Sequence, residues 1–235
     1  MIPLRDTIPS RTVPLVNNLL IGANVAVFVV QLLQGAALPA FVARWAFVPA
    51  RLFQLGGDAG ASPLYGALPL VTSMFLHGGL LHLAGNLLYL WIFGDNVEDA
   101  LGHGRYLVFY LGAGVAASLL QGGLSPASTV PVLGASGAIA GVLGAYFVLF
   151  PRARVVTLVP LFVLFPLVEV PATLYLLFWF LLQFWMGSQA LVNGALSGAQ
   201  GGVAWWAHVG GFVAGLLLLA LLNPRRRGGA RYSIR

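Results

Sequence analysis

The stretch GASGAIAG, residues 134–141, is the point from which the rest of the chain can be organised. An apolar helical pattern continues from it to Phe150, and the next charged residue after it is Arg152. A serine at position 136 therefore has two interpretations. It either fills space in a tightly packed membrane helix or is a nucleophile on the first turn of that helix.

The composition is that of a membrane protein. Of the 235 residues, 59% are hydrophobic and 8% are charged, whereas soluble domains carry roughly 25% charged residues. Several uncharged apolar runs approach the roughly 20 residues that a spanning helix needs. The chain has no cysteine, which excludes disulfides, thiolate nucleophiles and thiolate metal sites. All twelve basic residues are arginine, and they indicate membrane topology or contact with a lipid bilayer, not nucleic-acid binding.

The hydropathy pattern predicts an all-α, polytopic membrane protein with one six-helix domain. The expected spans are residues 13–33, 80–93, 106–120, 136–150, 172–186 and 205–222. Residues 34–68 are too polar to span, and we expect them to form an interfacial first loop. Residues 1–12 then form a cytoplasmic lead, residues 13–223 the membrane domain, and residues 224–235 a basic cytoplasmic tail.

The arginines predict the orientation. If the N-terminus is cytoplasmic, the far side of the membrane holds only Arg44 and Arg51, and every other arginine is cytoplasmic. Because cytoplasmic loops are enriched in basic residues, we expect both termini to be cytoplasmic. The membrane is expected to be the cytoplasmic membrane of a cell. Ser136 then lies near the non-cytoplasmic end of its helix.

Four polar residues at membrane depth suggest chemistry, because such residues are costly there. His82 and Asn86 are four apart, on one face of the second helix. His208 lies one turn into the sixth helix, and Ser136 begins the fourth. Together they match acyl transfer, with Ser136 as nucleophile and His208 as general base. His82, Asn86 and the backbone N–H of Ser136 would stabilise the oxyanion.

Glycines explain how two of these helices could meet. Gly137 and Gly141 form one face of small residues, and Gly211 and Gly215 form another. Such faces let helix backbones approach closely in a membrane. We expect helix packing of this kind to bring Ser136 and His208 together.

Each residue also has a structural interpretation. A membrane serine often bonds within its own helix, and an intramembrane histidine often ties two helices together. His77 and His103 are interpreted as interfacial or loop residues without a role. Glu98, Asp99 and Arg105 are interpreted as a solvated cytoplasmic cap.

Three ordered motifs together resemble the rhomboid intramembrane serine proteases. The motifs are HLAGN (residues 82–86), GASG (134–137) and AHVGGFVAG (207–215). The resemblance covers essentially the whole chain and includes WAFVPA (45–50), Glu98 with Gly102, and the fifth helix with Trp179 and Gln183. One departure is Ala140, where some members have an aromatic residue packed on the histidine. His208 would then be oriented by Trp205, by Trp206 or by the glycine-lined backbone.

The resemblance implies a Ser136–His208 dyad without a third acid and without a metal or cofactor. It implies single-span transmembrane proteins as substrates, cut near the outer end of their helix. The fifth helix and residues 186–203 would act as lateral gate and lid.

Other functions fit the sequence less well. A metalloprotease would need His-Glu-x-x-His, and an aspartyl protease would need two intramembrane aspartates. A transporter would require a coupling-ion carboxylate and usually shows internal repeats. The main alternative is a rhomboid-like protein that binds membrane clients without cleaving them, but such proteins lack the serine or the histidine.

Overall fold

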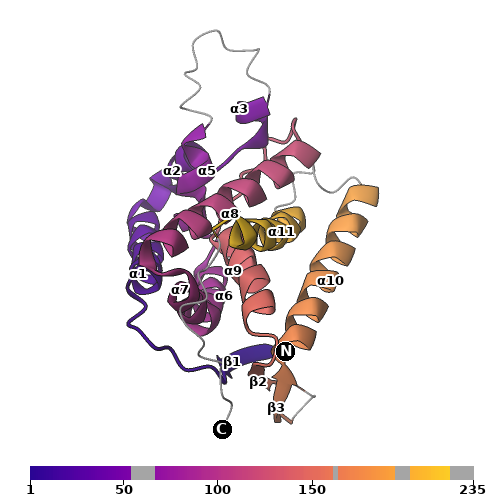
Figure 1. Ribbon diagram of the computed structural model, residues 1–235. Helices are drawn as coiled ribbons and strands as arrows, with labels where there is room; N and C mark the ends of the chain where they lie inside the picture. The colour runs from indigo at the N-terminus through magenta and orange to yellow at the C-terminus, as the bar shows by residue number, and fades with distance from the viewer. Residues whose placement is uncertain (54–66, 161–163, 194–201, 223–235) are drawn as a thin grey trace.

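The computed structural model describes residues 1–53, 67–160, 164–193 and 202–222 (Figure 1). Residues 194–201 of the predicted lid, residues 54–66 of the first loop and the whole of the predicted basic tail lie outside the described residues. The described chain is mostly helical, as the hydropathy pattern predicted.

A helix occupies each of the six predicted spans. They are α1 (Leu15–Leu33), α6 (Leu80–Tyr89), α8 (His103–Leu124), α9 (Ser136–Leu149), α10 (Ala172–Val192) and α11 (Trp205–Leu222). Four of these, α1, α8, α10 and α11, are long and apolar enough to cross a bilayer. A fifth span results if the helices at Pro69–Phe75 and Leu80–Leu101, which meet at 96°, are counted as one. The multi-pass helical fold is therefore confirmed.

The second span ends later than predicted. The sequence placed its end at Phe93, but a π-helical turn, η3 (Leu90–Gly94), leads directly into α7 (Asp95–Leu101). A Cβ on Gly94 would lie 2.1 Å from Oδ1 of Asn17, so this turn packs tightly against α1. The polar residues of α7 have partners on the N-terminal segment, and the helix continues through them.

The first loop forms short helices, and the segment that follows it contacts α9 through η2. The helices are η1 (Gly35–Ala37), α2 (Leu38–Trp45) and α3 (Pro49–Phe53), followed after the undescribed part by α5 (Pro69–Thr72) and η2 (Ser73–Phe75). Phe47 is fully buried and exchanges two backbone hydrogen bonds with Val132, at 3.1 and 2.7 Å. Since Val132 precedes Ser136 by four residues, this pairing fixes the segment that leads into α9.

A small antiparallel sheet, which the sequence did not predict, closes one end of the bundle. Its strands are β1 (Ile2–Asp6), β2 (Arg154–Leu158) and β3 (Leu167–Pro171), in the order β1-β2-β3. From the sequence, residues 1–12 are expected to be only a lead before the first span. Instead, β1 pairs with β2 across about 150 residues of sequence, a contact that no local pattern reports.

Helix α9 is the centre of the bundle, with α8, α10 and α11 around it (Figure 1). All of its residues from Gly137 to Tyr146 are buried. Its 14 residues extend about 21 Å at 1.5 Å per residue. That is shorter than the roughly 30 Å of a bilayer's hydrocarbon core. A helix this short and this buried places at least one of its ends inside the membrane.

Glycines set the distance between α9 and α11. A Cβ on Gly211 would lie 2.0 Å from the carbonyl oxygen of Gly137, and one on Gly215 would lie 2.2 Å from that of Gly141. No side chain fits at these separations, so the backbones touch directly. Ser136 directly precedes Gly137 on α9, and His208 lies one turn before Gly211 on α11, so this close contact brings the two residues near each other.

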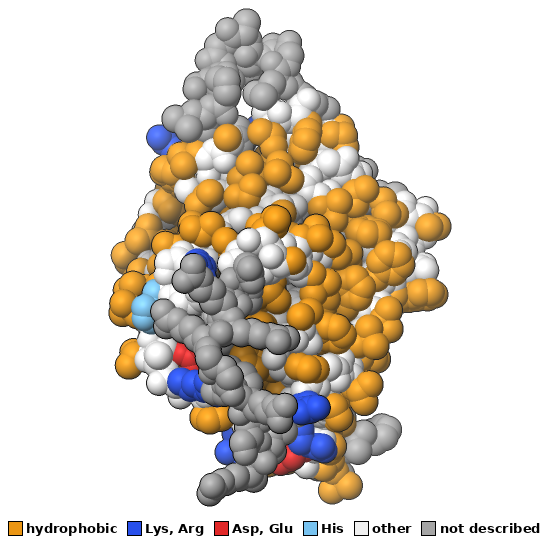
Figure 2. Space-filling model, viewed as in Figure 1, with side chains coloured by type: hydrophobic (Ala, Val, Ile, Leu, Met, Phe, Trp, Pro, Cys, Tyr) orange, Lys and Arg blue, Asp and Glu red, His pale blue; other side chains and the backbone are white. Residues whose placement is uncertain are grey.

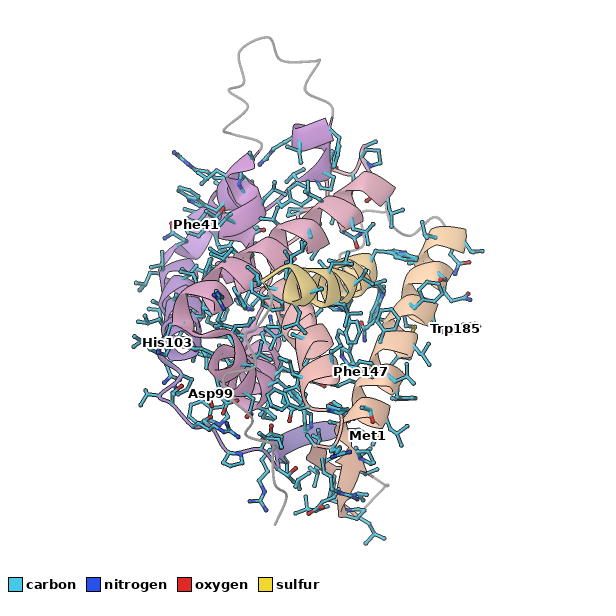
Figure 3. All side chains as sticks on the ribbon, viewed as in Figure 1. Met1, Phe41, Asp99, His103, Phe147 and Trp185 are labelled. Carbon is cyan, nitrogen blue, oxygen red and sulfur yellow. The ribbon has the colours of Figure 1, made fainter. Side chains whose placement is uncertain are left out.

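The outside of the bundle is apolar. Large hydrophobic side chains are exposed on its outer helices, and Figure 2 shows them as a broad continuous surface. On α10, Leu174 and Phe178 are exposed, and Trp185 points away from the bundle in Figure 3. Such a surface suits contact with lipid chains.

Candidate active site

The side chains of Ser136 and His208 are hydrogen-bonded to each other. Ser136, at the first position of α9, donates from Oγ to Nε2 of His208 at 2.8 Å. Ser136 is half-buried, and His208 is 9% exposed. A hydroxyl that donates to an imidazole nitrogen has the arrangement of an activated nucleophile and its base.

An amide from α10 holds the other nitrogen of the His208 ring. Nδ1 of His208 donates to Oε1 of Gln183 at 2.8 Å, and Gln183 is 5% exposed. The proton of the neutral ring is thus on Nδ1, which leaves the lone pair of Nε2 free to accept from Ser136. The group behind the histidine is therefore a neutral amide.

Two tryptophans enclose the His208 ring. The ring centre of Trp179 is 5.8 Å away, and that of Trp205 is 6.3 Å away and perpendicular. Trp205 was one of the orienting groups that we considered. Trp206 was another, but its Nε1 donates to the carbonyl oxygen of Gly187 at 2.9 Å. Besides Ser136, the groups that contact the His208 ring thus come from α10 and α11.

His82 faces the loop that precedes Ser136. Its Nδ1 accepts from the backbone N–H of Gly78 at 3.3 Å, so the proton of the neutral ring is on Nε2. A Cβ on Gly134 would lie 2.8 Å from that Nε2. Gly134 has φ of 123°, which side-chain-bearing residues rarely adopt. Glycine at position 134 therefore permits both this turn and the close approach of His82.

Asn86 brings a second donor to the same place. It is 8% exposed, and its Nδ2 is buried with no hydrogen-bond partner among the described residues. The same atom would be 3.7 Å from a Cβ on Gly134. Buried donors are rarely left without a partner, so an unpaired donor close to Ser136 suggests that a ligand oxygen completes it.

His77 lies in the loop between η2 and α6, as one of the two sequence-based interpretations had it, but it is buried, at 2% exposed. Its backbone N–H and carbonyl both bond to the side chain of Gln31, at 2.9 and 3.0 Å, and its ring lies 5.1 Å from that of His82. His77 therefore packs its ring edge-on against that of His82. In the sequence, the short link HGG (residues 77–79) before α6 could have indicated that His77 lies close to His82.

A small cavity adjoins Ser136. Its volume is about 20 Å³, and Ser73, Ser118 and Gly134 contribute to its walls together with Ser136. A space of this size, with three serines in an otherwise apolar or glycine lining, has room for a single water molecule. In the part of the chain that the structure describes, no three His, Cys, Asp or Glu side chains gather as metal ligands.

Comparison with known proteins gives a family match. Residues 66–225 match the model of the Rhomboid domain family. The chain is 49% identical over 76 residues to a protein named rhomboid protease GluP from Bacillus subtilis, a match to 32% of this chain and 14% of that protein.

Two mitochondrial proteins are also similar. Rhomboid protein 1 of Saccharomyces cerevisiae is 32% identical over 154 residues, which are 64% of this chain and 40% of the yeast protein. The human presenilin-associated rhomboid-like protein is 35% identical over 97 residues, 40% of this chain and 26% of that protein. The matched region thus spans less than half the length of each of these relatives.

Proposed function

The chain belongs to the rhomboid family, and we propose that it is an intramembrane serine endopeptidase acting through Ser136 and His208. The observation that carries this proposal is the 2.8 Å hydrogen bond from Ser136 Oγ to His208 Nε2. A relative named as a rhomboid protease supports it. A client-binding protein without activity would have no need of this pairing.

The proposed reaction is acyl transfer in two steps. Nε2 of His208 takes the proton of Ser136 as Oγ attacks the carbonyl carbon of the scissile peptide bond. The same proton then goes to the leaving amine, and an ester on Ser136 remains. A water molecule gives a proton to Nε2 and attacks this ester; that proton then passes from Nε2 to Oγ as the bond to Ser136 breaks, which releases the acid product and restores both side chains. The cavity beside Ser136 would hold such a water.

We propose that three donors stabilise the negative charge on the carbonyl oxygen. They are Nε2–H of His82, Nδ2 of Asn86 and the backbone N–H of Ser136. The first two lie at Gly134, two residues before the nucleophile. The third is one of the first N–H groups of α9, which have no partner within their helix. Donors of this kind stabilise an oxyanion more than a ground-state carbonyl.

We propose single-span transmembrane proteins as substrates and the cytoplasmic membrane as the site of action, with both termini cytoplasmic. Exposed Arg5, Arg152 and Arg154 lie at the sheet end of the bundle, where Figure 2 shows most of the basic side chains on that face. The site would then open toward the other side. Residues 13–223 would form the membrane domain, with β1 joined to it.

A serine-directed fluorophosphonate probe tests the proposal on purified protein in detergent. We expect the probe to label the wild type and to label neither Ser136→Ala nor His208→Ala. A thermal unfolding transition in each sample would show that all three proteins are folded. Labelling of Ser136→Ala would refute the nucleophile assignment. An unlabelled, folded wild type would favour the client-binding alternative.

The orientation is testable because the natural chain has no cysteine. We expect Ala40→Cys, in the first loop, to react with a membrane-impermeant maleimide in intact spheroplasts. Ser233→Cys, in the tail, should react only after lysis. The reverse pattern would overturn the proposed topology.

A further inference from the structure

We propose that Gln183 is a positioning residue that holds His208 in the tautomer and orientation its role as base requires. This inference rests on the proposed function of the Ser136–His208 pair. It concerns a residue on α10, a helix that contributes neither the nucleophile nor the base.

The geometry around Gln183 supports one specific role. Its Oε1 accepts from Nδ1–H of His208 at 2.8 Å, while Nε2 of the same ring accepts from Ser136 at 2.8 Å. The three side chains therefore form a line of two hydrogen bonds. Gln183 is 5% exposed and His208 is 9% exposed, so the hydrogen bond between them is buried.

Tautomer selection explains why this acceptor matters. A neutral imidazole carries its proton on either nitrogen, and only the form protonated at Nδ1 has a lone pair at Nε2 for Ser136. An acceptor fixed at Nδ1 stabilises that form and holds the ring plane. In triads of serine enzymes a carboxylate does this and also stabilises the imidazolium. The amide of Gln183 supplies orientation and tautomer without a charge.

The location of Gln183 on α10 gives this hydrogen bond a further consequence. Of the four long spans, α10 has the smallest buried share, 22% of its apolar window. Near the first residues of α10, the hydroxyl of Tyr175 is hydrogen-bonded to that of Tyr89 on α6, with 2.6 Å between the oxygens. If the upper part of α10 moves away from α11, the Gln183–His208 bond breaks. The base is thus correctly set only while α10 is packed in place.

Three single variants test the role of Gln183. Gln183→Met keeps the volume and removes the acceptor, whereas Gln183→Glu keeps an acceptor at the same place. Gln189→Met is the matched control, because Gln189 lies on the same helix and is exposed. We measure kcat and KM for a single-span membrane substrate in detergent, together with the thermal unfolding midpoint and the rate of fluorophosphonate labelling.

We expect Gln183→Met to lower kcat by about 10- to 100-fold, because Nδ1–H is left buried without an acceptor. KM should change less than about twofold, and Gln183→Glu should recover most of the lost kcat. Labelling should slow in proportion to kcat. Gln189→Met should match the wild type.

Two results would overturn this role and leave the proposed function intact. One is a Gln183→Met protein with wild-type kcat. The other is equal loss in Gln183→Met and Gln183→Glu that follows a loss of thermal stability, which would make Gln183 a packing residue. Failure of the proposed function is a different result, because the wild type itself would then neither cleave nor label.

Discussion

Two clusters of polar side chains lie toward opposite ends of α9, and they differ in how their hydrogen bonds are completed. The inner cluster comprises Asp6, Asn17, Glu98, Tyr106 and Tyr146. The outer cluster comprises His82, Asn86, Ser136, Gln183 and His208. Both sit in an apolar protein, where an unmet polar group is costly.

In the inner cluster the polar atoms find partners within the protein. Glu98 is 1% exposed and accepts from the backbone N–H groups of Val16 and Asn17, at 2.9 and 2.7 Å, and bonds to His103 as well. Asn17 accepts from Tyr106 at 2.8 Å and donates to the carbonyl of Leu90 at 3.0 Å. We had interpreted Glu98 as part of a solvated cap, and that was wrong, because it caps the start of α1.

In the outer cluster some polar atoms have no partner. Nδ2 of Asn86 is buried without one among the described residues, and His82 is exposed beside it. A network in which every polar atom has a partner stabilises a fold, whereas donors without a partner close to Ser136 are available to the oxygen of a bound ligand. Variants of the inner cluster should therefore affect stability, and variants of the outer cluster should affect rate.

The largest expected effect is on the dyad. Ser136→Ala and His208→Ala should each lower the cleavage rate on the order of 10⁴-fold or more. The first removes the oxygen that bonds to the substrate carbonyl, and the second removes the group that transfers the proton. Their unfolding midpoints should stay close to that of the wild type. Cleavage of a membrane substrate and thermal unfolding, measured on the same samples, check both statements. A variant of Ser136 or His208 with an unfolding midpoint far below that of the wild type would contradict the claim that the outer cluster affects rate and not stability.

The next effect is on stability, at Glu98. Glu98→Ala leaves two N–H groups at the start of α1 without their acceptor, and we expect a loss of about 3 kcal/mol in the free energy of unfolding. The rate of substrate cleavage per folded molecule should not change. Glu169→Ala is the control, because its pair with Arg154 at 3.1 Å is about half exposed and should contribute less than about 1 kcal/mol. Equal losses in the two variants would contradict the structural role of Glu98.

A smaller effect is expected at Asn86. Asn86→Ala should lower kcat about 10- to 100-fold with KM nearly unchanged, because the donor acts on charge that develops in the transition state. Asn86→Asp, which cannot donate when ionised, should lower kcat at least as much. A change confined to KM would assign Asn86 to substrate binding.

The smallest effect is a pH dependence at Asp6. Burial raises the pKa of Asp6 from 3.8 to about 6, against the opposing effect of its hydrogen bond from Tyr146. The folded protein therefore binds this proton more tightly than the unfolded chain does. The resulting stability is complete below about pH 4 and is lost as the pH rises through 6.

Asp6→Asn isolates this contribution. The difference in unfolding midpoint between wild type and variant should move against the wild type from pH 4 to pH 7 and then stay constant. A difference that does not vary over this range would show that Asp6 titrates normally in the folded protein. Cleavage by the variant at pH 8, per folded molecule, should equal that of the wild type.

The helical fold followed from the sequence because hydropathy is local. Each span could be recognised from about 20 neighbouring residues. The helix ends did not follow from hydropathy: the second span runs on through Asp95 to Leu101, since the polar residues there bond to the N-terminal segment. The motifs likewise pointed to Ser136 and His208, which the structure brings to hydrogen-bonding distance.

By itself, then, the sequence determined the membrane setting, the six apolar helices, the family and the residues suited to acyl transfer. Only the tertiary structure decided which side chain sits behind His208, that Glu98 and His77 are buried, and that residues 2–6 form a strand against residues 154–158. The reason is the same in each case. These contacts join segments far apart in the chain, and their partners are chosen by the packing of helices around α9 rather than by any neighbouring residue.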